Sequence, residues 1–159
     1  MKEQKITFGA GCFWHVEYDF KKVNGVIKTN VGYMGGNEKK YPNPSYKEVS
    51  SDKTGFIEVC EIEYNPKKIS FKELLKIFWK IHDPTQLNRQ GPDYGTQYKS
   101  VIFYYTPEQK ILAEKLMKEE QKNHKDKIVT EIRKAGKFYK AEEYHQNYLN
   151  KKGLNSCRI

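Results

Sequence analysis

The chain has 159 residues, with 29 Lys and Arg against 20 Asp and Glu, which gives a formal net charge of +9. This length suits one domain with a real core, and no apolar run approaches the about 18 residues of a membrane span. The lysines are spread along the chain among acidic residues, so the composition favours a solvated basic surface over a nucleic-acid footprint.

The first half of the chain predicts three strands and one helix. Residues 4–9 predict a strand, and residues 12–22 predict a helix because apolar side chains recur there at helical spacing. A second strand is expected over residues 26–33. Residues 37–51 contain two prolines and an asparagine and predict a long ordered loop. The clearest strand prediction covers residues 56–64, which an Asn-Pro pair ends.

The second half follows the same alternation. A capping box at Ser70 predicts a helix that begins there and ends before His82. Residues 84–98 predict another loop, since they contain two prolines and two glycines. A strand is expected over residues 99–105, and Thr106-Pro107 then starts a third helix. The remaining predictions are a strand near residues 128–132 and a polar C-terminal segment.

Several of these connections are too short for parallel crossovers. We therefore expect an α+β fold, a two-layer α/β sandwich whose largely antiparallel or mixed sheet is flanked by helices and long ordered loops. Residues 1–159 are expected to form a single catalytic domain, and residues from about 150 to 159 a flexible C-terminal tail.

Cysteine usage indicates the compartment. The chain has three cysteines, Cys12, Cys60 and Cys157. They form no CxxC motif and do not make a disulfide scaffold. The N-terminus leads into a strand and is unlike a signal peptide. We therefore expect a cytoplasmic protein with reduced thiols, in which an exposed cysteine has a catalytic or redox use.

The tetrapeptide Gly11-Cys12-Phe13-Trp14 stands at the turn between the first strand and the first helix. A cysteine at a helix start is close to the unpaired N–H groups and positive dipole end, which favour the nucleophilic thiolate. Phe13 and Trp14 would add a flat apolar wall suited to a methyl group or a thioether. The alternative is a buried core cysteine.

Glu58 is the one charged residue on an otherwise apolar or aromatic face of the 56–64 strand, a face that it shares with Cys60. A carboxyl group among apolar neighbours should have a raised pKa, which suits a general acid near neutral pH. The alternative is a glutamate paired with one of the many lysines. We interpret Cys60 as structural, because it faces the core.

The two long loops carry many hydrogen-bonding side chains, among them Tyr46, Asp93 and Tyr98. Tyrosine hydroxyls near a nucleophile can hold an oxygen that gains negative charge. Trp14 interrupts the possible dinucleotide fingerprint that begins at Gly9, there is no P-loop, and the histidines and cysteines lack metal-ligand spacing. We expect no cofactor and no metal.

Taken together, these segments resemble the A-type methionine sulfoxide reductases, the peptide-methionine (S)-S-oxide reductases. The likeness runs in order over most of the chain. Its motifs are GAGCFW at 9–14, VGYMGG at 31–36, YPNPSYKEV at 41–49, TGFIEVCEIEYNP at 54–66, FWKIHDPTQLNRQGPDYGTQYKSVIFY at 78–104 and FYKAEEYHQNYL at 138–149. Phe56 departs from the pattern, because the family more often has His there.

The resemblance implies reduction of the S epimer of methionine sulfoxide, free or in oxidised proteins. The Cys12 thiolate would attack the sulfoxide sulfur and become a sulfenic acid. The remaining matches are Glu58 as the acid, Tyr46 and Tyr98 as hydrogen-bond donors to the oxygen, Asp93 as an organising acid, and Phe13 and Trp14 as the methyl pocket.

The resemblance also implies a second thiol, and Cys157 in the C-terminal tail is placed to supply it. A disulfide between Cys157 and Cys12 would then be reduced by thioredoxin. We expect a monomer with neither nucleic acid nor membrane as partner. The alternative use of Cys157 is an incidental exposed thiol.

Two other functions are left open. In a thiol hydrolase or acyltransferase, Cys12 would pair with His145 or His82 and an acid such as Asp93, and Cys157 would not be needed. A basic module would instead use its tyrosines to bind nucleic acid. The sequence leaves the role of His145 undecided, and a lone histidine is more often structural.

Overall fold

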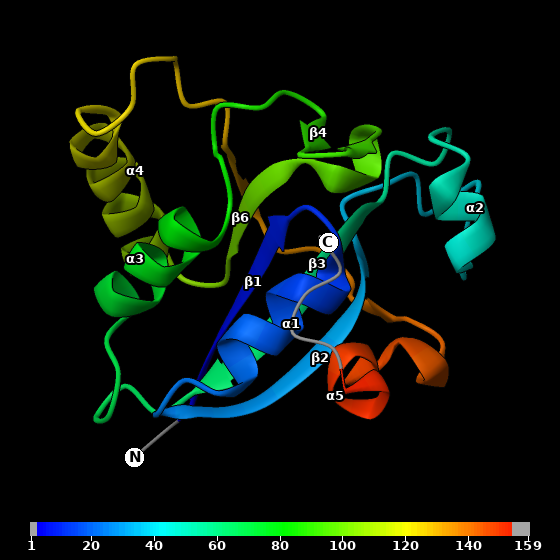
Figure 1. The fold of residues 1–159 in the computed structure, drawn as a ribbon, viewed down its shortest axis with the longest axis horizontal. Helices are drawn as coiled ribbons and strands as arrows, with labels where there is room; N and C mark the ends of the chain where they lie inside the picture. The colour runs from blue at the N-terminus through cyan, green and yellow to red at the C-terminus, as the bar shows by residue number, and fades with distance from the viewer. Residues whose placement is uncertain (1–2, 154–159) are drawn as a thin grey trace.

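Residues 3–153, which the computed structural model describes, form a six-stranded mixed sheet with the strand order β7–β6–β1–β3–β2–β8 (Figure 1). Neighbouring strands are antiparallel except β6 and β7, which run parallel. This arrangement confirms the expected fold class. The strands are β1 (Gln4–Ala10), β2 (Val26–Met34), β3 (Ile57–Tyr64), β6 (Ser100–Tyr104), β7 (Glu131–Lys134) and β8 (Tyr139–Lys140).

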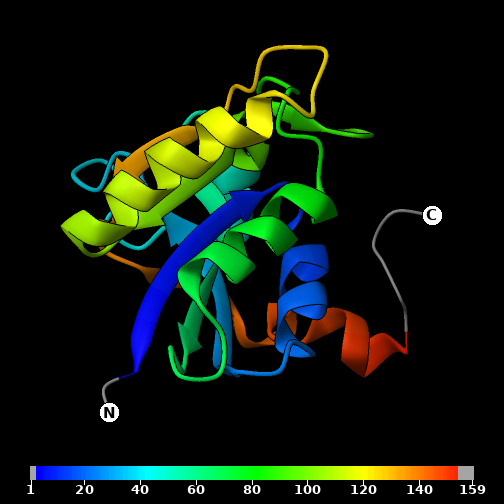
Figure 2. The same cartoon turned by 90° about the vertical axis from the view of Figure 1, so that its left-hand side faces the viewer.

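Three longer helices, α1 (Phe13–Lys21), α3 (Phe71–Ile81) and α4 (Pro107–Gln121), begin where local sequence signals predict. At α3 the Ser70 hydroxyl accepts a hydrogen bond from the Glu73 N–H at 3.1 Å, while the Glu73 carboxylate accepts one from the Ser70 N–H. These bonds satisfy orphan N–H groups of the first turn. In Figure 2, α3 and α4 lie side by side, with α3 against β1 and α4 against β6 and β7.

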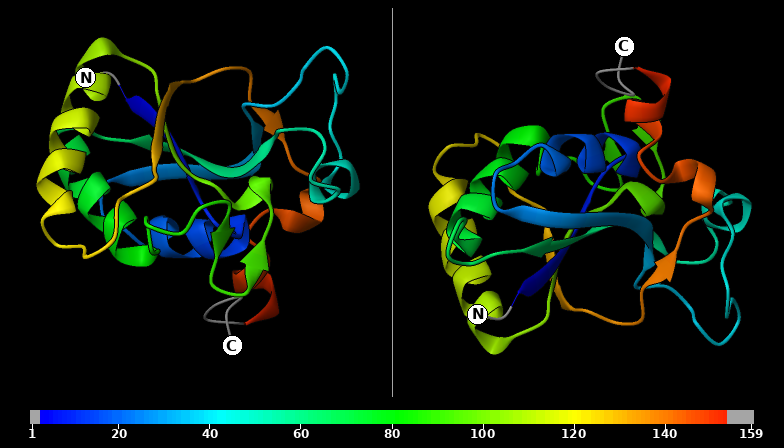
Figure 3. Two further views of the ribbon diagram at one scale, coloured as in Figure 1. Left: turned by 90° about the horizontal axis from the view of Figure 1, so that it is seen from above. Right: turned by 90° about the horizontal axis from the view of Figure 1, so that it is seen from below.

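The two faces of the sheet are covered differently. Helix α1 lies on one side, over a large core in which Phe8 of β1 stacks on Phe78 of α3 with ring centroids 4.6 Å apart. The chain near residues 133–138 crosses the other side (Figure 3), where Phe138 packs on a smaller apolar cluster that includes Ile57 and Val59. The second face of β3 is therefore buried along its first half.

The two predicted loops contain short regular elements. Residues 37–51 include α2 (Tyr46–Ser50), which the capping box of Ser45 starts. Residues 84–98 include a hairpin of β4 (Arg89–Gln90) and β5 (Asp93–Tyr94) and the 3₁₀ helix η1 (Thr96–Tyr98). A five-residue helix and two-residue strands are too short for a hydrophobic period to develop, so the prolines and glycines dominated the prediction. The strand predicted near residues 128–132 lies instead at Glu131–Lys134.

The C-terminal segment is more ordered than we expected at its beginning. It forms the 3₁₀ helix η2 (Glu143–His145) and then α5 (Tyr148–Lys152), which lies beside α1 (Figures 1 and 2). Tyr148 of this helix stacks on Trp14, and residues 150–152, where we expected the flexible tail to begin, are helical. Cys157 lies outside the described residues. Within residues 3–153, no helix is long and apolar enough to cross a membrane.

Candidate active site

Cys12 lies between the end of β1 and the start of α1. Gly11 before it has a φ of 91°, a conformation that strains any L residue, so the turn depends on glycine. Cys12 is the N-cap residue of α1, and its carbonyl accepts hydrogen bonds from the N–H groups of His15 and Val16. The side chain of Cys12 is partly exposed. The helix dipole and free N–H groups at this end favour the thiolate.

Glu58 approaches the same turn from the sheet. Its side chain is only 1 % exposed, and its Oε1 accepts a hydrogen bond from the backbone N–H of Phe13 at 3.3 Å. The bond joins the middle of the sheet to the residue next to Cys12. The carboxyl group of Glu58 is thereby held next to the residue that follows Cys12.

Tyr46 and Tyr98 bring two hydroxyl groups to this carboxyl and thiol. Burial, together with the negative charges of Glu58 and Cys12, raises the pKa of Tyr46 to about 12. Burial and the charge of Glu58 also raise the pKa of Tyr98 well above its ordinary value. Both hydroxyl groups therefore keep their protons at neutral pH and can donate hydrogen bonds. Tyr46 begins α2 and Tyr98 ends η1, so the two long loops supply them.

Asp93 lies at the start of β5, where its backbone pairs with Gln90. Its negative charge contributes, after burial and the charges of Glu58 and Tyr46, to the raised pKa of Tyr98. The charges of Cys12, Glu58 and Asp93 therefore all act on the hydroxyl of Tyr98.

Glu142, which sequence reasoning did not single out, contacts two residues close to the site. One carboxylate oxygen accepts a hydrogen bond from the Tyr33 hydroxyl at 3.0 Å, and the other accepts one from the Tyr46 backbone N–H at 3.1 Å. Although burial acts in the opposite direction, backbone N–H groups and the Tyr33 hydroxyl hold the pKa of Glu142 below its ordinary value. Tyr33 faces Glu58 across the β2–β3 pair. Its position inside the motif at 138–149 was the only sequence signal for Glu142.

An aromatic cluster holds the two residues after Cys12. Phe13 is fully buried against Tyr33 and His145, whereas Trp14 is partly exposed. The Trp14 indole N–H donates a hydrogen bond to His145 Nδ1 at 2.8 Å, and the indole ring stacks on Tyr148 with ring centroids 3.7 Å apart. Trp14 therefore has a fixed orientation, and it contributes the accessible part of the apolar wall.

The two histidines named for a hydrolase are engaged elsewhere. Burial lowers the pKa of His145, and its Nδ1 accepts from Trp14, so the ring is neutral with its proton on Nε2. Among the described residues, His145 Nε2 has no hydrogen-bond partner. Both ring nitrogens of His82 contact other groups, the Phe78 carbonyl and the Ser100 hydroxyl. The geometry does not favour a histidine base for Cys12.

Two further features concern possible metal ligands and Cys60. In the part of the chain that the structure describes, no three His, Cys, Asp or Glu side chains are grouped to hold a metal ion. Cys60 is fully buried, and burial raises the pKa of its thiol well above the ordinary value. It is a structural core residue, as its place in the strand predicts. The arrangement around Cys12 can therefore combine nucleophilic attack with proton delivery to an oxygen.

Known proteins are similar to this chain over nearly its full length. The family model described as peptide methionine sulfoxide reductase matches residues 4–159. A peptide methionine sulfoxide reductase MsrA from Geobacter metallireducens is 56 % identical over 156 residues, which cover 97 % of this chain and 94 % of that protein.

Solved structures are also similar. Reduced Mxr1 from Saccharomyces cerevisiae has a TM-score of 0.92 and 42 % identity, covering 96 % of this chain and 87 % of the yeast chain. Mxr1 in complex with Trx2 has a TM-score of 0.65 and 28 % identity, covering 92 % of this chain and 85 % of the yeast chain.

Proposed function

The chain belongs to the peptide methionine sulfoxide reductase family, whose members reduce methionine sulfoxide through a thiol, and on that premise we propose how its own residues carry the reaction. The single observation that supports the assignment most strongly is the 3.3 Å hydrogen bond between the Phe13 N–H and Glu58. It puts a buried carboxyl group next to a thiol at a helix N-terminus. A nucleophile and a proton donor are the two groups that sulfoxide reduction needs.

In the first step, the Cys12 thiolate attacks the sulfur of the sulfoxide. Glu58 gives its proton to the sulfoxide oxygen, which makes that oxygen a better leaving group. The protonated hydroxyl groups of Tyr46 and Tyr98 donate hydrogen bonds to the same oxygen as its negative charge grows. Asp93 organises the site beside Tyr98. The methyl group of the substrate lies against Trp14, and the buried Phe13 completes the apolar wall behind it.

The sulfur–oxygen bond of the substrate then breaks. The bond between the Cys12 sulfur and the substrate sulfur also breaks, and the oxygen becomes bonded to Cys12. Methionine leaves, and the Cys12 sulfur is oxidised to a sulfenic acid. Overall, one oxygen atom passes from the sulfoxide to the thiol, so that a thiol and a sulfoxide give a sulfenic acid and a thioether. We propose the S epimer as substrate, because the A-type family gives this preference and separate enzymes serve the two epimers.

Cys157 completes the cycle in this proposal. Its thiol attacks the sulfenic acid sulfur of Cys12, a disulfide forms, and water leaves. A dithiol protein then reduces the disulfide by thiol–disulfide exchange and is itself oxidised. The complex of Mxr1 with Trx2 supports a thioredoxin as this reductant. Such a cycle suits the cytoplasm, where dithiol reductants keep thiols reduced.

We propose that the chain acts as a monomer with a single catalytic domain, because one chain supplies every described residue of the site. Size-exclusion chromatography with light scattering tests this. A Cys–His hydrolase is not favoured, since both ring nitrogens of His82 and Nδ1 of His145 bond to groups other than the thiol.

Resolved S and R methionine sulfoxides, with dithiothreitol as reductant, test the assignment directly. The wild-type protein should reduce the S epimer and leave the R epimer. Cys12→Ser should be inactive, and Glu58→Gln should be slow. Equal activity of the three proteins would remove the proposed site, whereas reduction of the R epimer alone would remove the proposed stereochemistry.

A further inference from the structure

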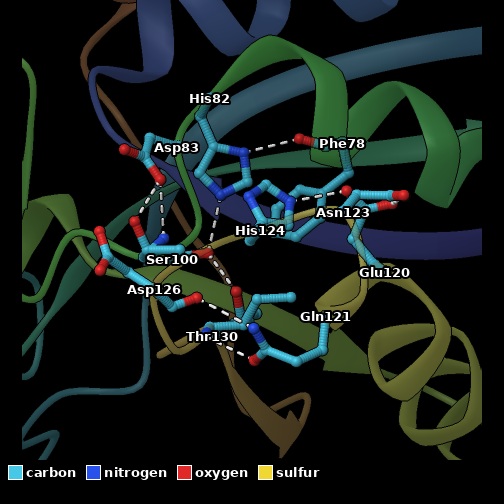
Figure 4. Close-up of polar contacts among 12 residues, drawn as sticks. Phe78, His82, Asp83, Ser100, Glu120, Gln121, Asn123, His124, Asp126 and Thr130 are labelled. Atoms are coloured by element: carbon cyan, nitrogen blue, oxygen red, sulfur yellow. Dashed lines mark hydrogen bonds and ion pairs between the residues drawn. The ribbon is translucent and has the colours of Figure 1, made fainter.

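A buried chain of hydrogen bonds lies next to the active site and has no part in the chemistry proposed above (Figure 4). His82 follows the last residue of α3, and its Nδ1 is 2.6 Å from the carbonyl oxygen of Phe78. His82 Nε2 is 2.8 Å from the hydroxyl of Ser100, which in turn is 2.7 Å from the hydroxyl of Thr130. His82, Ser100 and Thr130 are all buried.

The chemistry of the bonded groups indicates which atom donates each of these hydrogen bonds. A carbonyl oxygen only accepts, so His82 Nδ1 carries the proton and donates it to Phe78. Nε2 of the neutral ring then accepts a hydrogen bond from the Ser100 hydroxyl. The Ser100 oxygen in turn accepts from Thr130. Each of these atoms is thereby given a partner, and removing the Ser100 hydroxyl takes away the bonds that it makes to His82 Nε2 and to the Thr130 hydroxyl.

Ser100 connects this series of hydrogen bonds to the active site. It is the first residue of β6, two positions after Tyr98, and it pairs across the sheet with Ala10, the last residue of β1. Ala10 is two positions before Cys12. From Ala10, the backbone continues to the nucleophile Cys12. From Ser100, it leads back to Tyr98, whose hydroxyl is proposed to bind the sulfoxide oxygen.

We propose that His82 and Ser100 are positioning residues for the reaction, and that their hydrogen bond holds Tyr98 at its working distance from Cys12. The proposal rests on the proposed function, in which Tyr98 binds the oxygen. His82 lies at the C-terminal end of α3, which is not part of the sheet. Its hydrogen bond to Ser100 therefore fixes the start of β6 to this helix. A misplacement near 1 Å can cost about 100-fold in rate.

The same pair of strands offers a matched control. Thr7 of β1 is fully buried, and its hydroxyl is 2.6 Å from the hydroxyl of Tyr105, just beyond β6. Thr7→Val and Ser100→Ala each remove one buried hydroxyl from the β1–β6 pair. Thr7 lies five positions before Cys12 and further from the site. If such bonds only stabilise the fold, both variants should behave alike.

The experiment measures the first turnover with S-methionine sulfoxide in a Cys157→Ser background, without reductant. Ser100→Ala should lower the rate constant at saturating substrate about tenfold, with the apparent substrate affinity within about twofold. Alkylation of Cys12 by iodoacetamide should stay within about twofold, because the thiol itself is unchanged. Thr7→Val should lose thermal stability as Ser100→Ala does and keep the full rate. Thr130→Val, a milder change, should follow Ser100→Ala in direction.

A double-mutant cycle separates positioning from general destabilisation. In a Tyr98→Phe background, Ser100→Ala should cost less than about twofold, because the hydroxyl that it positions is already gone. A full tenfold loss in that background, an equal loss of rate in Thr7→Val, or an unchanged rate in Ser100→Ala would each overturn the proposal. If Tyr98→Phe alone had the wild-type rate, the role of Tyr98 in the proposed function would fail first, and this inference with it.

Discussion

Replacement of Glu58 by Gln tests the proton donor most sharply, because it removes the acidic proton and keeps the shape. The amide oxygen of Gln can still accept the hydrogen bond from the Phe13 N–H, which is 3.3 Å long in the wild-type protein. The start of α1 should therefore keep its position. The amide cannot deliver a proton to the sulfoxide oxygen, so the loss should be confined to the first chemical step.

The size of the loss follows from the burial of this residue. General acid catalysis contributes about 10²- to 10⁴-fold in rate, or about 3 to 5 kcal/mol of the activation barrier. Glu58 is only 1 % exposed, so bulk water has little access to replace it as the donor. We therefore expect the first-turnover rate of Glu58→Gln at neutral pH to fall about 10³-fold, near the middle of that range.

The assay quenches the reaction at short times and measures the methionine formed per enzyme, in the Cys157→Ser background. Glu61→Gln is the matched control. Glu61 lies on the same strand but on the opposite face, and its carboxylate is 3.8 Å from the Lys5 ammonium. This variant should keep the wild-type rate. A Glu58→Gln rate within threefold of wild type, or an equal loss in Glu61→Gln, would refute Glu58 as the acid.

Three further outcomes are expected. Tyr46→Phe removes one donor to the developing oxygen charge and should lower the turnover number about 10²-fold in steady-state assays, whereas an unchanged rate would exclude Tyr46 from oxygen binding. Cys157→Ser should give one methionine per enzyme with thioredoxin as reductant and then stop, and continued turnover would exclude Cys157 as the resolving thiol. Glu142 has a lowered pKa in the folded protein, so its contribution to stability is present above the ordinary carboxyl pKa and is lost as the pH falls through its folded value. The difference in unfolding free energy between wild type and Glu142→Gln, measured with urea, should therefore shrink on acidification, and a constant difference would contradict this assignment.

The sequence predicted the parts of the site that depend on neighbouring residues. Gly11 and the following helix put Cys12 at an N-terminus, and strand alternation put Glu58 on the core face. Both inferences use only local geometry, and the structure places both residues accordingly. Tyr46 and Tyr98 were found through loop composition and family resemblance, because no local period points a loop side chain toward a distant thiol.

The supporting residues could not be found in that way. Glu142 bonds to Tyr33 and Tyr46, which are 109 and 96 positions away along the chain, and His145 bonds to Trp14 across 131 positions. No periodicity in a single sequence encodes such pairs, since they depend on how the C-terminal segment packs against β2 and α1.

Short-range signals were thus sufficient for the four longest strands, the three longer helices and the nucleophile, because capping, turn and alternation rules act within a few residues. Only the tertiary structure decided which distant groups meet. Burial and close approach of charge raise the pKa of Tyr46 and Tyr98, and both effects arise when separate loops close over one end of the sheet.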